Sequence, residues 1–85
     1  MPATLTCTVS NIESDVTISW ESNSAALVSG SGGVTITTDT KSTGGTQNSV
    51  LAVDTPTTDT VYTCKVAEGT GYMIADVNVY GRFFI

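Results

Sequence analysis

The residues of this chain that could do chemistry are two cysteines and eight acidic side chains. The sequence contains no histidine, and no serine has a basic partner indicated by its neighbours, so nucleophilic catalysis lacks its usual machinery. Two thiols without histidine also fall short of the ligand set that zinc or iron requires. The sequence therefore predicts no enzymatic activity, no cofactor and no transition-metal site.

The two cysteines lie in segments that alternate strictly between apolar and polar residues. Cys7 shares a face with Leu5 and Val9, and Cys64 shares a face with Tyr62. This alternation predicts two strands whose thiols both point into a core. Two free thiols are the alternative, but the matched register favours a disulfide, which would supplement the small core of an 85-residue domain. A disulfide indicates an oxidising, extracellular location.

The composition indicates an all-β domain. Threonine is the commonest residue, and leucine, glutamate, lysine and arginine are scarce. Segments of β type predict strands at residues 3–9, 16–21, 34–38, 48–53, 61–66 and 72–80. Trp20 ends the second of these strands and offers a large aromatic side chain to the core. Several short strands without helical periodicity predict a two-sheet sandwich.

Three of the remaining segments have a distinct composition. Residues 39–47 are polar and contain two glycines, which predicts a long connection and the most mobile part of the chain. Residues 68–71 also contain two glycines and are expected to form the tip of a hairpin. Residues 25–28 are a short apolar run, which predicts either a small strand or a loop over the core.

The charge and hydropathy of the chain exclude two kinds of partner. The formal net charge is −5 with three basic residues, whereas nucleic acids and anionic membranes require clustered cations. No run of 18 apolar residues predicts a transmembrane span, and the first residues lack the features of a signal peptide. We therefore expect a fragment of a larger secreted or surface protein, with no membrane insertion within this chain.

These residues together resemble the pattern of an immunoglobulin-superfamily domain. Cys7 resembles the strand B cysteine and Trp20 the strand C tryptophan, whereas Leu51 resembles a core residue of strand E. Tyr62 and Cys64 resemble the Tyr-X-Cys motif of strand F. The resemblance implies an antiparallel two-sheet sandwich with one inter-sheet disulfide. It also implies that the Tyr62 hydroxyl bonds back to the turn between strands E and F.

The resemblance covers residues 3–80, so we expect one domain over residues 1–85 with an apolar tail at 81–85. The stretch between Trp20 and Leu51 favours an I-type or C2-type domain over a full variable type. Only two residues precede strand B, so strand A is expected to be missing. Its loss would leave an open edge of strand B that invites pairing with another copy.

The resemblance implies a non-catalytic role in recognition or cell adhesion, with a protein ligand or a neighbouring immunoglobulin domain as partner. A structural spacer in a tandem array is one alternative, and a self-associating module that pairs through the open strand A edge is another. Two surfaces compete as the binding site, and ordinary solvated surface is the alternative for both. The loop end contributes Glu13, Asp15, Glu68, Thr70 and Tyr72, and the face of strands G, F and C contributes Ile74, Lys65 and Tyr80.

Two further possibilities concern calcium and the tail. The carboxylates of Glu13, Asp15 and Glu68 could bind calcium, but no ligand-spaced motif occurs, which favours a solvated acidic rim. Phe83 and Phe84 belong to an apolar terminus that we expect to dock on this domain, on a neighbouring domain or on a second copy as a homodimer. A boundary cut through a linker is the alternative for the tail.

Overall fold

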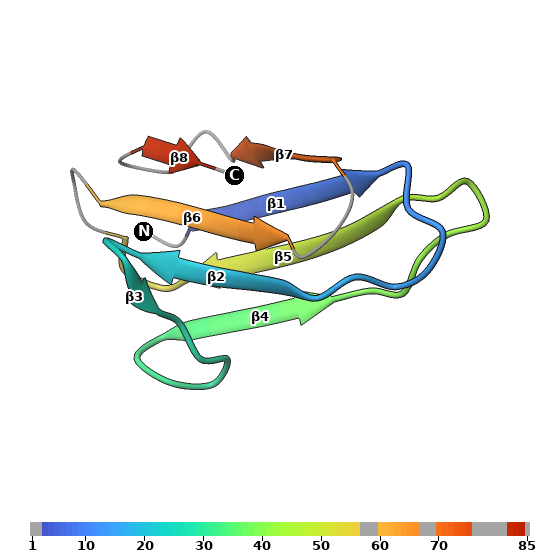
Figure 1. Cartoon of the computed structure of the whole chain (residues 1–85). Coiled ribbons are helices and arrows are strands. Elements are labelled where there is room, and N and C mark those ends of the chain that lie inside the picture. Colours follow the sequence, from blue (N-terminus) through green and yellow to red (C-terminus); the bar gives the residue numbers. More distant parts are fainter. Residues whose placement is uncertain (1–2, 57–59, 67–69, 76–81, 85) are drawn as a thin grey trace.

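A computed structural model describes residues 3–56, 60–66, 70–75 and 82–84, the last two segments by their backbone pairing (Figure 1). The strands are β1 (Ala3–Ser10), β2 (Ile18–Ser22), β3 (Ala25–Ala26), β4 (Val34–Thr38), β5 (Gln47–Val53), β6 (Val61–Val66), β7 (Thr70–Ala75) and β8 (Arg82–Phe84). None of the described residues belongs to a helix of the length and apolarity that a membrane crossing needs.

The strands form two four-stranded sheets that pack as layers (Figure 1). One sheet has the order β4-β5-β1-β7 and the other has the order β3-β2-β6-β8. Every strand pair is antiparallel except β6 and β8, which run parallel. The predicted all-β, two-sheet sandwich is therefore confirmed.

The core lies between the two sheets, and the alternation of the sequence explains it. Leu5, Cys7 and Val9 of β1 are fully buried, as is Leu51 of β5. Trp20 of β2 is 1% exposed and faces them from the opposite sheet. Because consecutive side chains of a strand point to opposite faces, the apolar residues reach the core while threonines such as Thr35 and Thr37 of β4 remain on the surface.

Residues 25–28, which were predicted as either a small strand or a loop over the core, contain both. Asn23 and Ser24, with φ of 49° and 70°, connect β2 to the two-residue strand β3. Positive φ at both central residues is the geometry of a tight hairpin whose twist matches its strands. The Asn23 side chain also accepts a hydrogen bond from the Val61 backbone at 2.9 Å, which attaches this hairpin to β6. Leu27 then packs against the core.

The strand β7 lies in a different sheet and has a different partner from those that were predicted. Residues 61–66 and 72–80 were expected to form a hairpin, but β7 lies in the other sheet from β6 and pairs with β1, from Leu5↔Ala75 to Ser10↔Thr70. The prediction of an open edge beside Cys7 is therefore wrong. The N–H and C=O groups along that edge of β1 are strong hydrogen-bonding groups, and β7 satisfies them within the chain.

The C-terminal tail contributes the strand β8. Its backbone pairs with β6 in the register Tyr62↔Phe83 and Thr63↔Phe84. The backbone of the tail thus docks on this chain, at the position beside β6 where the sequence predicted residues 72–80.

Candidate binding site

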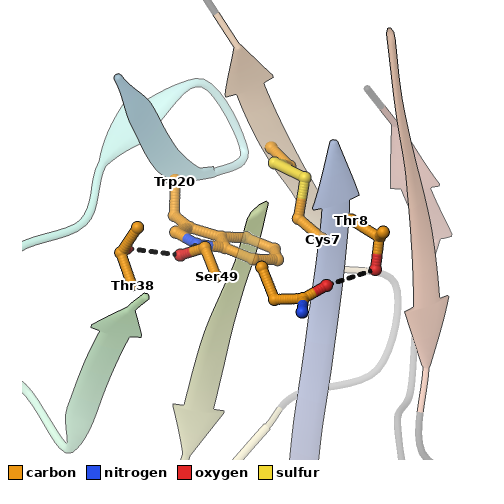
Figure 2. The surroundings of a disulfide bond; sticks show 7 residues. Cys7, Thr8, Trp20, Thr38 and Ser49 are labelled. Carbon is orange, nitrogen blue, oxygen red and sulfur yellow. Dashed lines mark hydrogen bonds between the residues drawn. A yellow bond between two sulfur atoms is a disulfide. The ribbon is translucent and has the colours of Figure 1, made fainter. Parts of the chain in front are cut away.

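The predicted structural residues form a rigid frame across the two sheets. Cys7 of β1 and Cys64 of β6 form a disulfide with a Cα–Cα distance of 6.4 Å (Figure 2). Trp20 pairs in register with Cys64, so the indole and the disulfide lie in one region of the core. Leu51 completes this layer from β5. Because all four side chains are buried, the frame itself offers no surface to a partner.

A polar network crosses the core beside the disulfide. The Trp20 indole Nε1 donates a hydrogen bond to the Ser49 hydroxyl at 2.9 Å, and the hydroxyl of Thr38 lies 2.8 Å from that of Ser49 (Figure 2). Ser49 is fully buried. A buried N–H without a partner is costly, so this bond explains why a serine occupies an inward position. The polar residue within the apolar face of the strand was the available sequence signal.

Tyr62 is also buried, and its hydroxyl is held near the start of its own strand. Burial raises the pKa of the Tyr62 phenol above its ordinary value, because the phenolate would be poorly solvated. A hydrogen bond with the Thr60 side chain acts in the opposite direction. Thr60 belongs to the connection between β5 and β6, where the resemblance placed the partner of this tyrosine.

Two loops at one end of the sandwich are joined to each other. We call residues 11–16 and 39–46 together the loop platform. The Ile12 amide donates a hydrogen bond to the Gly45 carbonyl at 3.2 Å. The Asp15 carboxylate accepts a hydrogen bond from the backbone amide of Lys41 at 2.7 Å. These bonds connect segments that are far apart in the sequence, so each loop restrains the other.

The side chain of Gln47 provides the third connection. Its Oε1 accepts a hydrogen bond from the Val16 amide at 2.9 Å, and its Nε2 donates to the Val16 carbonyl at 3.2 Å. Gln47 is 3% exposed and stands at the start of β5. Its amide therefore takes the place of a neighbouring strand at Val16. The strand β2 begins at Ile18, two residues later than the strand that the sequence predicted from residue 16.

The second platform loop is closed by its own hydrogen bonds. The Asp39 carboxylate accepts a bond from the Asn48 amide at 2.7 Å, and the Ser42 amide donates to the Thr46 carbonyl at 2.7 Å. Gly45 has a φ of 80°, and a Cβ there would lie 3.1 Å from the Ile12 carbonyl oxygen. These bonds fasten the loop, and its mobility relative to the rest of the chain stays a prediction. Composition signals a loop, but not the bonds that fasten it.

The surface of the loop platform is acidic and accessible. Glu13, Asp15 and Asp39 are exposed, whereas Lys41 is half-buried and donates from Nζ to the Ser42 carbonyl at 3.2 Å. Two of the three exposed carboxylates also accept hydrogen bonds from backbone amides: Asp15 from Lys41 of the platform, and Asp39 from Asn48 of β5. The acidic charge is therefore attached to a fixed backbone.

Of the other residues predicted for the loop end, Thr70 and Tyr72 lie in a strand that begins near the platform. The register pairs Thr70 with Ser10 and Tyr72 with Thr8, so β7 begins beside the last residues of β1. Glu68 lies outside the described residues, which leaves the three-carboxylate calcium site a prediction. Within the described part of the chain, no group of three or more acidic, histidine or cysteine side chains is placed to hold a metal ion.

The second predicted surface is not assembled as expected. Lys65 and Ser19 pair in register on β6 and β2, but Ile74 belongs to β7 in the other sheet. Tyr80 lies outside the described residues. Lys65 instead forms an ion pair with Glu21 at 2.9 Å, in which the lysine side chain is 60% exposed. Such a pair contributes little stability, so it does not mark a site by itself.

The comparisons with known proteins agree with this architecture. The model of the immunoglobulin domain family matches residues 2–71. Because the match spans most of the chain, this chain belongs to the immunoglobulin domain family. No curated protein and no solved structure matches it significantly.

The family defines the general class of function. Immunoglobulin domains are in general non-catalytic modules of recognition or adhesion that mediate contacts between proteins. A disulfide-bonded domain of this kind is typical of extracellular and cell-surface proteins.

Proposed function

We propose that this chain is an extracellular recognition or adhesion module of a larger surface or secreted protein, and that it binds a protein ligand through the loop platform. The observation that carries the proposal is the set of hydrogen bonds that fix the two loops: Ile12 and Asp15 bond across to the other loop, and Gln47 of β5 bonds to Val16. Binding orders loops at a cost in conformational entropy, and loops that are already ordered avoid that cost.

The charge of the platform indicates the chemistry of the ligand. Glu13, Asp15 and Asp39 are exposed on it, and the chain carries a net charge of −5. A basic protein surface would complement this charge and would be steered toward it during encounter. Thr70 and Tyr72 are the proposed flanking contacts, with the tyrosine as an aromatic anchor at the edge of the platform.

Multivalent display of the chain tests the proposal. Fluorescent tetramers would be titrated onto an array of extracellular domains, and each bound domain would be retested with Glu13→Gln and Asp15→Asn. Both variants remove one charge, and the asparagine retains an oxygen that can accept the Lys41 amide. We expect each to weaken binding, and raised salt to weaken the wild type.

Asp54 provides the matched control. It is exposed and follows the last residue of β5, at the end of that strand opposite to the platform. Asp54→Asn removes the same charge but should leave binding unchanged. Equal binding by the wild type and both platform variants would exclude the platform as the site. Absence of any bound domain would favour the structural spacer.

A further inference from the structure

The strand β4 lies at the edge of its sheet, with β5 on one side (Figure 1). Its sequence is Val-Thr-Ile-Thr-Thr, so every residue is β-branched and none is charged. Such a strand has high β-propensity and carries none of the lysine or proline residues that commonly protect edges. Left open, this edge would be a template for another strand.

The loop between β3 and β4 covers that edge. Figure 1 shows this loop passing below β4, on the side away from β5. The Ile36 amide donates a hydrogen bond to the Ser29 hydroxyl at 2.9 Å, and the same hydroxyl donates to the Ile36 carbonyl at 3.3 Å. One side chain thus occupies both backbone groups of Ile36.

Backbone bonds of the same loop cover the neighbouring position. The Gly30 amide donates to the Val34 carbonyl at 2.7 Å, and the Val34 amide donates to the Ser31 carbonyl at 3.2 Å. In an antiparallel ladder, alternate residues direct their N–H and C=O groups to the same side. Val34 and Ile36 are therefore consecutive outward-facing positions of β4, and both are occupied within the chain.

We propose that the Ser29 hydroxyl closes the β4 edge against a second copy of this chain. A two-fold antiparallel pair centred on Ile36 would have the two Ile36 residues exchange both of their backbone hydrogen bonds. Those are the groups that Ser29 occupies. The same symmetry would pair Thr35 of one copy with Thr37 of the other, which is a favourable cross-strand combination without charge repulsion.

The edge is thus self-complementary, which identifies a second copy as its occupant. The pairing would join two four-stranded sheets into one continuous sheet. The covered edge of β1 leaves no comparable route there, because β7 already pairs with it. Ser29 is exposed, so at Ile36 the closure depends on one accessible hydroxyl, whereas backbone bonds of the loop cover Val34.

The variant Ser29→Ala tests this proposal by sedimentation velocity over a concentration series and by hydrogen exchange at the Ile36 amide. We expect that amide to exchange about tenfold faster, as for the loss of a single hydrogen bond. We also expect the variant to self-associate at least about tenfold more tightly than the wild type. Ser31→Ala is the matched control, because Ser31 contributes its backbone carbonyl, and it should behave like the wild type.

Two further comparisons keep the test decisive. Ser29→Thr and Ser29→Val have the same shape and differ in the hydroxyl, so only the valine variant should associate, even if Ser29→Ala fails to fold. Adding Thr37→Lys to an associating variant should restore the monomer, because a charged lysine on an edge strand opposes pairing and the two lysines would lie diagonally across the pair on one face. Association equal to the wild type in the alanine and valine variants would overturn the proposal. Association that survives Thr37→Lys would also overturn it.

Discussion

Replacing Ser49 by alanine would test whether the polar network beside the disulfide stabilises the sandwich. The change removes the acceptor of the Trp20 indole N–H, which lies 2.9 Å from the Ser49 hydroxyl. Trp20 is 1% exposed and Ser49 is fully buried, so water does not replace the lost partner. A buried donor left without an acceptor costs about 1–3 kcal/mol of unfolding free energy.

The size of the domain determines how far this loss of unfolding free energy lowers the melting temperature. For a domain of 60–100 residues, each kcal/mol lowers Tm by roughly 4–8 °C, so we expect a fall of about 4–24 °C. Thr38 is exposed, and its hydroxyl can bond to water once Ser49 is gone, so it adds little to the cost. Urea denaturation monitored by circular dichroism and by the single tryptophan would measure the effect.

A double-mutant cycle with Trp20→Phe identifies the bond responsible. Phenylalanine lacks the indole N–H, so Ser49→Ala should cost less in that background, with a coupling of roughly 1 kcal/mol or more. Thr38→Ala is the control, since it leaves the bond between Trp20 and Ser49 intact. A Ser49→Ala cost no greater than that of Thr38→Ala, or an undiminished cost with phenylalanine at position 20, would refute this account of Ser49.

Three other perturbations follow from the same structure. Cys64→Ala should lower the free energy of unfolding by about 2–5 kcal/mol in urea denaturation, and a loss below about 1 kcal/mol would contradict the role of the disulfide. Gly45→Ala should lower the free energy of unfolding by about 1–2 kcal/mol, because residue 45 has a φ of 80° and its Cβ would lie 3.1 Å from a backbone oxygen. Gly44→Ala would meet only a hydroxyl at 3.9 Å and should be nearly neutral. Equal effects of the two alanines would refute the role of that contact. Burial raises the pKa of Tyr62 in the folded state, so its contribution to stability is complete below pH 10 and is lost as the pH rises through the folded pKa. Urea unfolding between pH 9 and 11 should show an alkaline loss of stability that Tyr62→Phe reduces, and an unchanged slope would count against it.

The elements that the sequence predicted best are strands in which the residues face the core and the solvent in turn. Residues 34–38 and 61–66 were predicted with the observed bounds of β4 and β6, because their apolar and polar residues alternate with the pleat of a strand. The same alternation placed Cys7 and Cys64 on inward faces, and the structure joins them. Alternation identifies the face of a strand, so it predicts the core well.

Alternation does not identify the neighbour of a strand, and this explains the error over β7. Residues 72–75 were correctly expected to be extended, but they pair with β1 and not with β6. Among the described strands, β1 has β5 on one side and β7 on the other. The choice is a property of the whole sandwich, and no short window of sequence contains it.

The platform shows a limit of another kind, because its signal was present in the sequence but lay in β5. Gln47 and Ser49 are polar residues at inward positions of a strand whose later inward residues are apolar. A buried polar side chain needs a partner, so each of them predicts a hydrogen bond to a distant segment. The identity of that segment, Val16 in one case and Trp20 in the other, required the fold.

The position of these two residues connects the core to the proposed binding surface. Ser49 bonds to Trp20 within the core, and Gln47, two residues earlier on the same face of β5, bonds to the loop that carries Glu13 and Asp15. The backbone of that loop is therefore positioned by β5 and by the neighbouring loop. It follows that Glu13 can be changed to alter what is recognised while the loop keeps its backbone. Changes at Gln47 should instead alter binding through the position of the loop.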